Sequence, residues 1–191
     1  MKDNKMISGI TKDNVVLWGC SKGDLKGKIE YYNNIQHFLS GYTEDDASFT
    51  KDRFAKVDVE YDENRVDEIK YRSIGAEEYI KEGYIYELTK HVYMKNFKKP
   101  IYINFFDNLC VVWDINKLKK PLTFYKKKCR ITSEFKNTDN RKKYKWVADL
   151  DYDDAIGVMY RNSKNKYRPL NKDERIRCKK WLLEKNELLK N

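Results

Sequence analysis

Asp58, Glu68 and Lys70 have the residue types and spacing to act together. Residues two apart in a β-strand share a face, so Glu68 and Lys70 project together while Ile69 points toward a core. Asp58 stands between two valines, and its side chain is expected to leave the core as well. Carboxylates hold Mg²⁺ through hard oxygen ligands, and a bound metal polarises phosphate and lowers the pKa of a bound water. With a lysine to stabilise charge and orient that water, these residues predict metal-assisted phosphodiester hydrolysis.

Whether Asp58 joins Glu68 depends on the register of the hairpin expected around the polar turn at 62–65. Residues directly opposite one another in an antiparallel pair share a face. A loop of odd length, such as 61–65 or 63–65, places Asp58 on the face of Glu68. A four-residue loop places Val59 opposite Glu68 and moves Asp58 to the other side. The functional interpretation therefore requires a three- or five-residue connection, with or without a bulge.

Asp58, followed after a gap by Glu68-Ile69-Lys70, resembles the signature of the PD-(D/E)XK, or restriction-endonuclease-like, nuclease superfamily. Val57 stands where the motif has proline, a departure that is frequent in the superfamily. The order of elements extends the resemblance over about residues 28–116, because the superfamily core is a helix, a hairpin with the two acids, a second helix and further strands. The resemblance implies an α/β fold, a restriction-endonuclease-like mixed sheet flanked by helices. It also implies that Asp58 and Glu68 bind Mg²⁺, or Mn²⁺, and that cleavage leaves a 5′-phosphate and a 3′-hydroxyl.

Helical spacing of apolar residues predicts a first helix over 29–39 and a second over 76–97. The resemblance implies that a glutamate of the first helix, Glu30, approaches the metal, and that the second helix lends Tyr86 and Lys90 to the site. Simpler alternatives exist for each. Acids are favoured in the first turn of any helix, and a tyrosine and a lysine on one stripe can be packing and snorkelling residues.

Runs of β-branched and aromatic residues predict strands at 15–18, 99–106, 109–115 and 146–150. The last segment, 172–190, reads as a helix capped by Asn171. A cluster of acids follows the strand at 146–150. Because it lacks the glycine and the distal glutamate of a calcium-binding loop, we expect a turn with helix-capping aspartates. The acids are Asp149, Asp151, Asp153 and Asp154.

The net charge is +10, from 40 basic and 30 acidic residues, which favours an acidic partner, with nucleic acid ahead of a membrane surface. Basic residues interleaved with aromatic ones lie between 117 and 130 and again at 141–145. This pattern suits a surface that follows a nucleic-acid backbone, although a solvated strand edge protected by lysine is the equal alternative. The predicted nucleic-acid-binding residues are Lys119, Lys120, Lys126, Lys127, Lys128, Arg141, Lys142 and Lys143.

Other chemistries find little support in the chain. It has two histidines and four cysteines, no zinc-finger spacing and no glycine-rich phosphate loop. No apolar stretch is long enough to span a membrane, and residues 1–5 do not begin a signal peptide. We expect free thiols, with Cys110 in the core, and a cytoplasmic protein, or one in the host cytoplasm if the Lys-, Asn- and Tyr-rich composition reflects a phage or viral origin.

At 191 residues the chain is expected to form a single domain, a nuclease-like core at about 28–116 with a basic extension at about 117–191. The predicted function is a metal-dependent nuclease, with DNA favoured as substrate and a homodimer compatible with cutting both strands. The alternatives are a non-catalytic nucleic-acid-binding or assembly module on the same fold, and a basic structural protein in which Glu-x-Lys is chance. Convergence of Asp58, Glu68 and Lys70 in a concave, basic cleft would favour the enzyme, whereas a flat or occluded hairpin face would argue against it.

Overall fold

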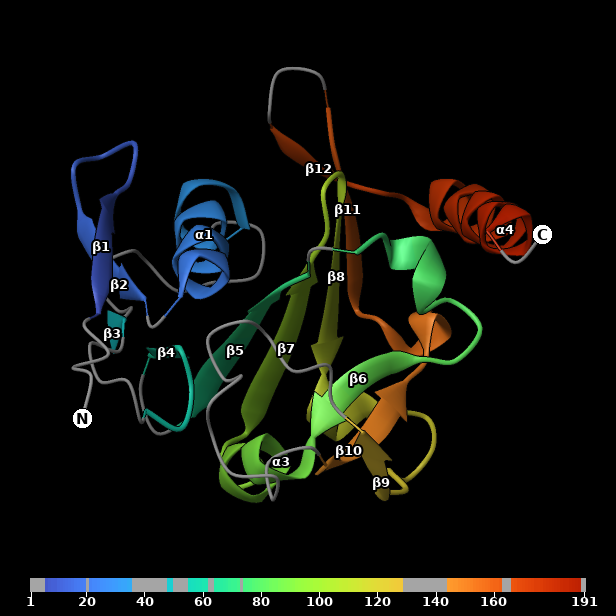
Figure 1. Cartoon of the computed structure of the whole chain (residues 1–191), viewed down its shortest axis with the longest axis horizontal. Coiled ribbons are helices and arrows are strands. Elements are labelled where there is room, and N and C mark those ends of the chain that lie inside the picture. The colour runs from blue at the N-terminus through green and yellow to red at the C-terminus, as the bar shows by residue number, and fades with distance from the viewer. Residues whose placement is uncertain are drawn as a thin grey trace.

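The computed structural model describes residues 6–19, 21–35, 48–49, 55–61, 64–72, 74–128, 144–162 and 166–189. Its centre is a seven-stranded sheet in the order β12-β11-β8-β7-β5-β4-β3 (Figure 1). Only β5 and β7 pair in parallel, and the other neighbours are antiparallel. The strands are β3 (Ser48–Phe49), β4 (Val59–Glu60), β5 (Arg65–Tyr71), β7 (Lys99–Phe105), β8 (Leu109–Asp114), β11 (Gly157–Arg161) and β12 (Tyr167–Pro169).

A second, three-stranded antiparallel sheet has the order β6-β10-β9, and the first two strands form a separate hairpin. These strands are β1 (Ile7–Ile10), β2 (Val16–Gly19), β6 (Tyr84–Glu87), β9 (Tyr125–Lys128) and β10 (Tyr144–Leu150). The α-helices are α1 (Lys22–Glu30), which continues as a π-helical turn over Tyr31–Ile35, α3 (Leu88–Met94) and α4 (Lys172–Leu188). Short 3₁₀ turns occupy Ala76–Glu78, Ile115–Lys117 and Tyr152–Asp154. The protein is thus mixed α/β, with a mostly antiparallel sheet flanked by helices.

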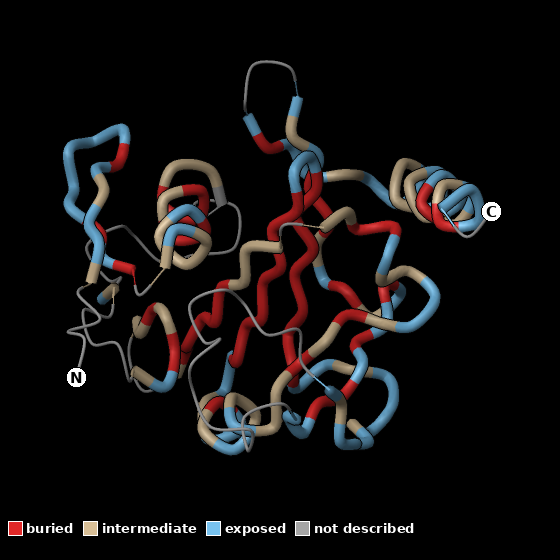
Figure 2. The backbone as a smooth tube through the Cα atoms, viewed as in Figure 1, coloured by how far each residue is buried: buried red, intermediate tan, exposed pale blue. Residues whose placement is uncertain are grey.

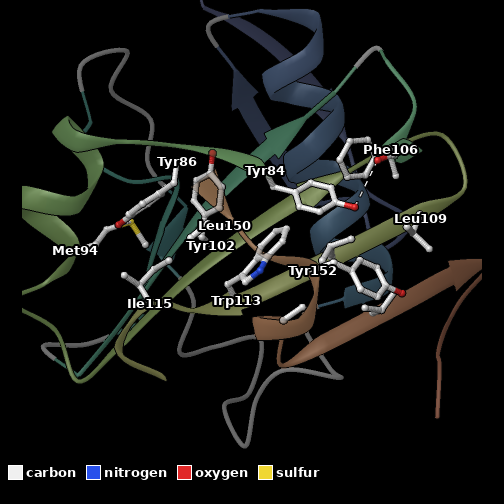
Figure 3. Close-up of a cluster of buried hydrophobic side chains, with 14 of the residues drawn as sticks. Tyr84, Tyr86, Met94, Tyr102, Phe106, Leu109, Trp113, Ile115, Leu150 and Tyr152 are labelled. Atoms are coloured by element: carbon white, nitrogen blue, oxygen red, sulfur yellow. Dashed lines mark hydrogen bonds between the residues drawn. The ribbon is translucent and has the colours of Figure 1, made fainter. Parts of the chain in front are cut away.

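The central strands of the large sheet are buried on both faces and are the most continuously buried part of the described chain (Figure 2). One face packs against the three-stranded sheet, α3 and α4. Aromatic rings dominate that core (Figure 3), where Tyr84 packs 5.1 Å from Trp113 and Tyr86 packs 4.8 Å from Tyr102 between ring centroids. The other face carries Ile69 and its aliphatic neighbours and packs against the α1 side of the molecule. Alternation along β5 therefore assigns Glu68 and Lys70 to the aromatic core side of the sheet.

Helix α1 approaches β5 closely because a glycine faces the strand. A Cβ at Gly27 would lie 3.0 Å from Cγ2 of Ile69. The predicted start of this helix at residue 29 is wrong, since α1 begins at Lys22, where the Ser21 side chain accepts a hydrogen bond from the Asp24 N–H at 3.2 Å. The part of the predicted helix beyond residue 35 lies outside the described residues.

The predicted helix over 76–97 is also wrong. Only 88–94 is α-helical, and it follows strand β6 rather than continuing a longer helix. Gly83 has φ 91°, a conformation that favours glycine, and a Cβ there would lie 2.4 Å from Cβ of Asp149. Pairing of β6 with β10, far away in the sequence, overrides the helical spacing of the tyrosines.

Several other predictions are confirmed. The strands expected near 15–18, 99–106, 109–115 and 146–150 correspond to β2, β7, β8 and β10. Asn171 caps α4 in a capping box with Glu174, and Asp151 caps the 3₁₀ turn at the acidic cluster. Cys110 is a buried free thiol.

The predicted C-terminal extension shares both sheets with the core, because β11 pairs with β8 and β10 with β6. Within the described ranges, no helix is both long and apolar enough to cross a membrane.

Candidate active site

The β4–β5 hairpin has the register that the functional interpretation requires. Val59 lies opposite Asp67 and Glu60 opposite Val66, so residues 61–65 connect the last paired positions, a connection of odd length. Asp58, immediately before β4, donates its backbone N–H to the carbonyl of Asp67 at 3.2 Å, so Asp58 and Val59 both lie beside Asp67 at this end of the hairpin. The sequence-based prediction of an odd loop is confirmed. Asp58 lies close enough to Glu68 for its charge to help raise the pKa of Glu68.

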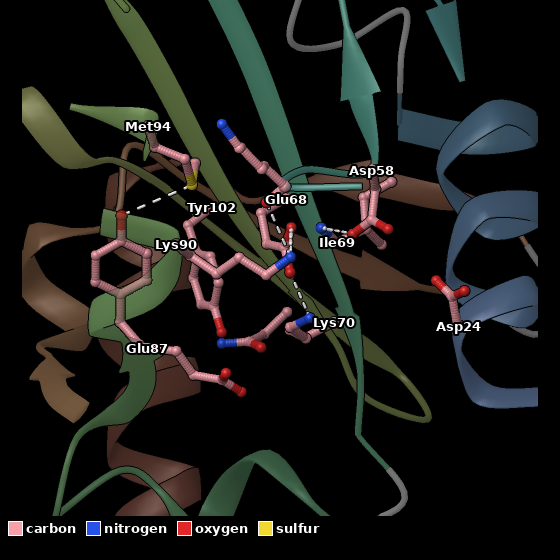
Figure 4. A network of polar contacts seen from close by, with 12 residues as sticks. Asp24, Asp58, Glu68, Ile69, Lys70, Glu87, Lys90, Met94 and Tyr102 are labelled. Atoms are coloured by element: carbon pink, nitrogen blue, oxygen red, sulfur yellow. Dashed lines mark hydrogen bonds and ion pairs between the residues drawn. The ribbon is translucent and has the colours of Figure 1, made fainter. Parts of the chain in front are cut away.

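Glu68 lies between two lysines. Its side chain is completely buried, Lys70 Nζ contacts Oε1, and Lys90 Nζ lies 2.9 Å from Oε2 (Figure 4). Burial raises the pKa of Glu68, with Asp58 adding to the rise, while the two ammonium groups oppose it. Burial alone would lower the pKa of Lys70, but the charges of Glu68 and Asp58 outweigh it and raise that pKa. The structure therefore brings Lys70 and Lys90 to the predicted site.

A third lysine, which sequence reasoning missed, holds Asp58. Asp58 Oδ1 lies 3.3 Å from Nζ of Lys28, while Oδ2 accepts the backbone N–H of Ile69 at 2.8 Å. Lys28 comes from α1, is buried, and also lies 3.6 Å from Asp24 one helical turn earlier. The Asp24–Lys28 spacing is the signal that could have identified it, but the helix was expected to begin after both residues.

Glu87 and Lys145 extend the network onto the second sheet. Lys145 Nζ, on β10, lies 2.9 Å from both carboxylate oxygens of Glu87, at the end of β6. Burial alone would raise the pKa of Glu87, but Lys70 and Lys145 outweigh it and hold that pKa below its usual range. Sequence reasoning missed Glu87 because it assigned this stretch to a helix.

Two other predicted residues do not join the site. The carboxylate of Glu30 lies 2.9 Å from Nη2 of Arg161, so its charged partner is on β11 rather than at the site. Tyr86 is fully buried on β6, with its hydroxyl 3.7 Å from Sδ of Met94. It packs behind the site, as the simpler alternative expected.

The predicted basic surface is partly described. Lys126, Lys127 and Lys128 lie on β9, an edge strand of the three-stranded sheet. Lys119 and Lys120 are exposed in the segment before it, where Lys119 Nζ lies 3.5 Å from Asp154. Three predicted residues lie outside the described residues: Arg141, Lys142 and Lys143.

The donors at the site fit a hard divalent cation in kind. Mg²⁺ is commonly held by one or two carboxylates and keeps several waters. Both oxygens of Glu68 are buried, and the ammonium groups of Lys70 and Lys90 compensate their charge. A cation at Glu68 requires one of these ammonium groups to move aside. Among the residues that the structure describes, no group of three or more His, Cys, Asp or Glu side chains gathers into a ready metal site.

Comparison of the chain with known proteins found no matching family model, no matching curated protein and no matching solved structure. Its function is therefore inferred from the arrangement of its own residues. What that arrangement defines is a mixed α/β protein in which, at one end of a hairpin, Lys28 contacts one acid, Asp58, while Lys70 and Lys90 contact the other, Glu68.

Proposed function

We propose that the protein is a metal-dependent nuclease that hydrolyses phosphodiester bonds of nucleic acid, with DNA the favoured substrate. The observation that carries this proposal is the odd register of β4 and β5, which brings Asp58 to the Glu68–Lys70 pair. Burying charged side chains beside a strand is costly, and a catalytic use would account for that cost.

The order of elements supports the same proposal. Helix α1, the β4–β5 hairpin, helix α3 and the parallel neighbour β7 occur in the order that the restriction-endonuclease-like resemblance implies, with strand β6 inserted before α3. Lys90 reaches Glu68 from α3, the helix that follows the hairpin. A restriction-endonuclease-like fold is accordingly part of the proposal.

In this mechanism Asp58 and Glu68 would hold Mg²⁺, or Mn²⁺, which when bound polarises the scissile phosphate and lowers the pKa of a water. The backbone N–H of Ile69 and the ammonium of Lys28 fix the orientation of Asp58. Lys70 orients the attacking water and stabilises the charge that develops on the phosphate. Lys90 compensates Glu68 and ties α3 to the preceding segment through the carbonyl of Lys56 at 2.9 Å.

A second candidate function is a nucleic-acid-binding or assembly module that does not cleave. The observation that favours it is the enclosure of Glu68, whose side chain has no exposed area and whose oxygens both meet lysines. If Lys70 and Lys90 remain in contact with Glu68, its carboxylate is unavailable to a metal, and these charges then only hold α3 and β5 together.

Incubation with plasmid, linear and single-stranded DNA distinguishes the two. Each substrate is tested with Mg²⁺, with Mn²⁺ and with chelator, and binding is measured in parallel. Cleavage that requires the metal supports the nuclease. Binding without cleavage under either metal supports the module, and the absence of both binding and cleavage rejects both candidates.

Lys70→Met should separate a catalytic lysine from a surface charge. Methionine keeps the apolar stem and removes only the ammonium group. We expect near-normal DNA binding and a loss of about a hundredfold or more in the single-turnover rate at saturating Mg²⁺, the scale for losing one transition-state stabiliser. Lys81→Met is the matched control, because Lys81 pairs with Glu187 at 2.9 Å outside the site. Loss of DNA affinity with an unchanged rate would make Lys70 a phosphate anchor instead.

Replacing Lys126, Lys127 and Lys128 together by glutamine should weaken nucleic-acid binding and flatten its salt dependence. Each phosphate contact contributes roughly 0.7 to 0.9 to the slope of log affinity against log salt. The control replaces three exposed basic residues of α4, Lys172, Arg177 and Lys180. Equal slopes for the β9 variant and the wild type would assign these lysines to protection of a strand edge.

A further inference from the structure

Two aromatic side chains stand exposed on one face of β10. Tyr144 is 51% exposed and Trp146 is 53% exposed. Further along the same face of the strand, Ala148 and Leu150 are buried against the rest of the protein, each 1% exposed. The apolar face of β10 thus extends from buried residues in the core to two large rings that are exposed to solvent.

Lysines of the neighbouring strand flank these rings. Lys128 lies directly opposite Tyr144, and Lys126 lies directly opposite Trp146, so the four side chains share one face. Lys126 Nζ lies 5.3 Å from the centroid of the Tyr144 ring. Both lysines are exposed. We call Tyr144, Trp146, Lys126 and Lys128 the β9–β10 platform.

Rings and cations in this arrangement match the chemistry of an unpaired nucleic-acid strand. Bases stack on aromatic rings whatever their identity, and lysines meet the phosphates. Amino acids two apart in a β-strand are about 7 Å apart, which is roughly twice the 3.4 Å rise between successive nucleotides in one strand of a DNA duplex. Bases in a duplex are stacked on one another and cannot offer their faces to the protein, so the platform favours a single strand.

The platform is also connected to the candidate active site. Lys145, between the two aromatic residues, points to the opposite face of β10 and binds Glu87 at 2.9 Å. Glu87 in turn lies close enough to Lys70 for the two charges to shift each other's pKa. One strand therefore carries the platform on one face and a member of the site's charge network on the other.

We propose that the β9–β10 platform binds single-stranded nucleic acid, with unpaired bases stacked on Tyr144 and Trp146 and phosphates held by Lys126 and Lys128. As a substrate site it rests on the proposed function, and it makes single-stranded or frayed nucleic acid the preferred substrate. As a binding site it is independent of cleavage.

The test measures fluorescence anisotropy of a labelled oligothymidylate and of a duplex of equal length, in chelator so that no cleavage occurs. We expect Tyr144→Leu/Trp146→Leu to lose about tenfold or more in affinity for the single strand, with duplex affinity unchanged. Tyr160→Leu/Trp181→Leu is the matched control, because these rings are 43% and 45% exposed on other elements. It should bind as the wild type does.

An abasic oligomer isolates stacking from charge. The wild type should bind it about as weakly as the leucine variant binds oligothymidylate, and Tyr144→Phe/Trp146→Phe should restore binding of oligothymidylate. Equal affinity of the wild type for abasic and thymidine strands overturns the proposal. Normal binding of the single strand by the leucine variant would also overturn it. So would a leucine variant whose only defect is loss of self-association, as measured by sedimentation. These results leave the nuclease proposal standing, whereas an enzyme that binds but never cleaves leaves the platform standing.

Discussion

Glu68→Gln is expected to lower Mg²⁺-dependent cleavage by about a thousandfold or more. Glutamine keeps the volume of the side chain but removes the charge that would hold the cation, and a metal supplies several kcal/mol of transition-state stabilisation in reactions of this kind. The fold should persist, since Lys70 and Lys90 retain 28% and 19% of their side-chain exposure and can turn toward water. Single-turnover cleavage, together with calorimetric titration of Mg²⁺, measures both consequences.

The matched control is Glu77→Gln. Glu77 is also largely buried and pairs with a lysine, Lys185 Nζ at 2.9 Å, but it fastens α4 to the 3₁₀ turn at Ala76–Glu78 and lies outside the site. Asp58→Asn should behave as Glu68→Gln does, because both acids are proposed ligands. Full activity in Glu68→Gln, with contaminating nuclease excluded, would reject the assignment of the site.

The second large effect is on stability and concerns the opposite face of β5. Arg65 and Asp67 form a bidentate pair, with Nε to Oδ1 at 2.8 Å and Nη2 to Oδ2 at 2.7 Å, and both are essentially inaccessible to solvent. The hydroxyl of Tyr31 also donates to Asp67. Burial raises the pKa of Asp67, while Arg65 and Tyr31 oppose the rise. The charges are thus compensated by each other rather than by water.

Arg65→Met should lower the free energy of unfolding by about 3–5 kcal/mol, because it leaves the carboxylate of Asp67 buried without its charged partner. The double variant Arg65→Met/Asp67→Leu should recover much of that loss, since it leaves no buried charge. Denaturant unfolding of both variants measures the difference. The control is Arg168→Met, which breaks a similar bidentate pair with Glu174 that lies at the surface and should hardly change stability. If the Arg65 variant were as stable as the control, the pair would contribute little to the fold.

The sequence by itself determined the parts of this protein that depend on local pattern. Alternation in Glu68-Ile69-Lys70 was enough to place the two charged residues on one face, because a strand has a period of two. Continuous β-branched and aromatic runs were enough to identify β7 and β8, whose burial on both faces leaves no polar alternation to read. Asn171 with Glu174 marked the start of α4, since capping uses only neighbouring residues.

Only the tertiary structure decided the features that depend on residues distant in the chain. The stretch 76–97 has helical spacing, yet β6 forms because β10 supplies its hydrogen-bond partners. The register that unites Asp58 with Glu68 was one of two that the turn allowed. Lys28 and Lys90 reach the acids because α1 and α3 pack on either side of β5, while Glu30 faces Arg161 instead. Each of these outcomes depends on which surfaces pack together, and the residues of one segment do not specify which distant segment of the chain will pack against it.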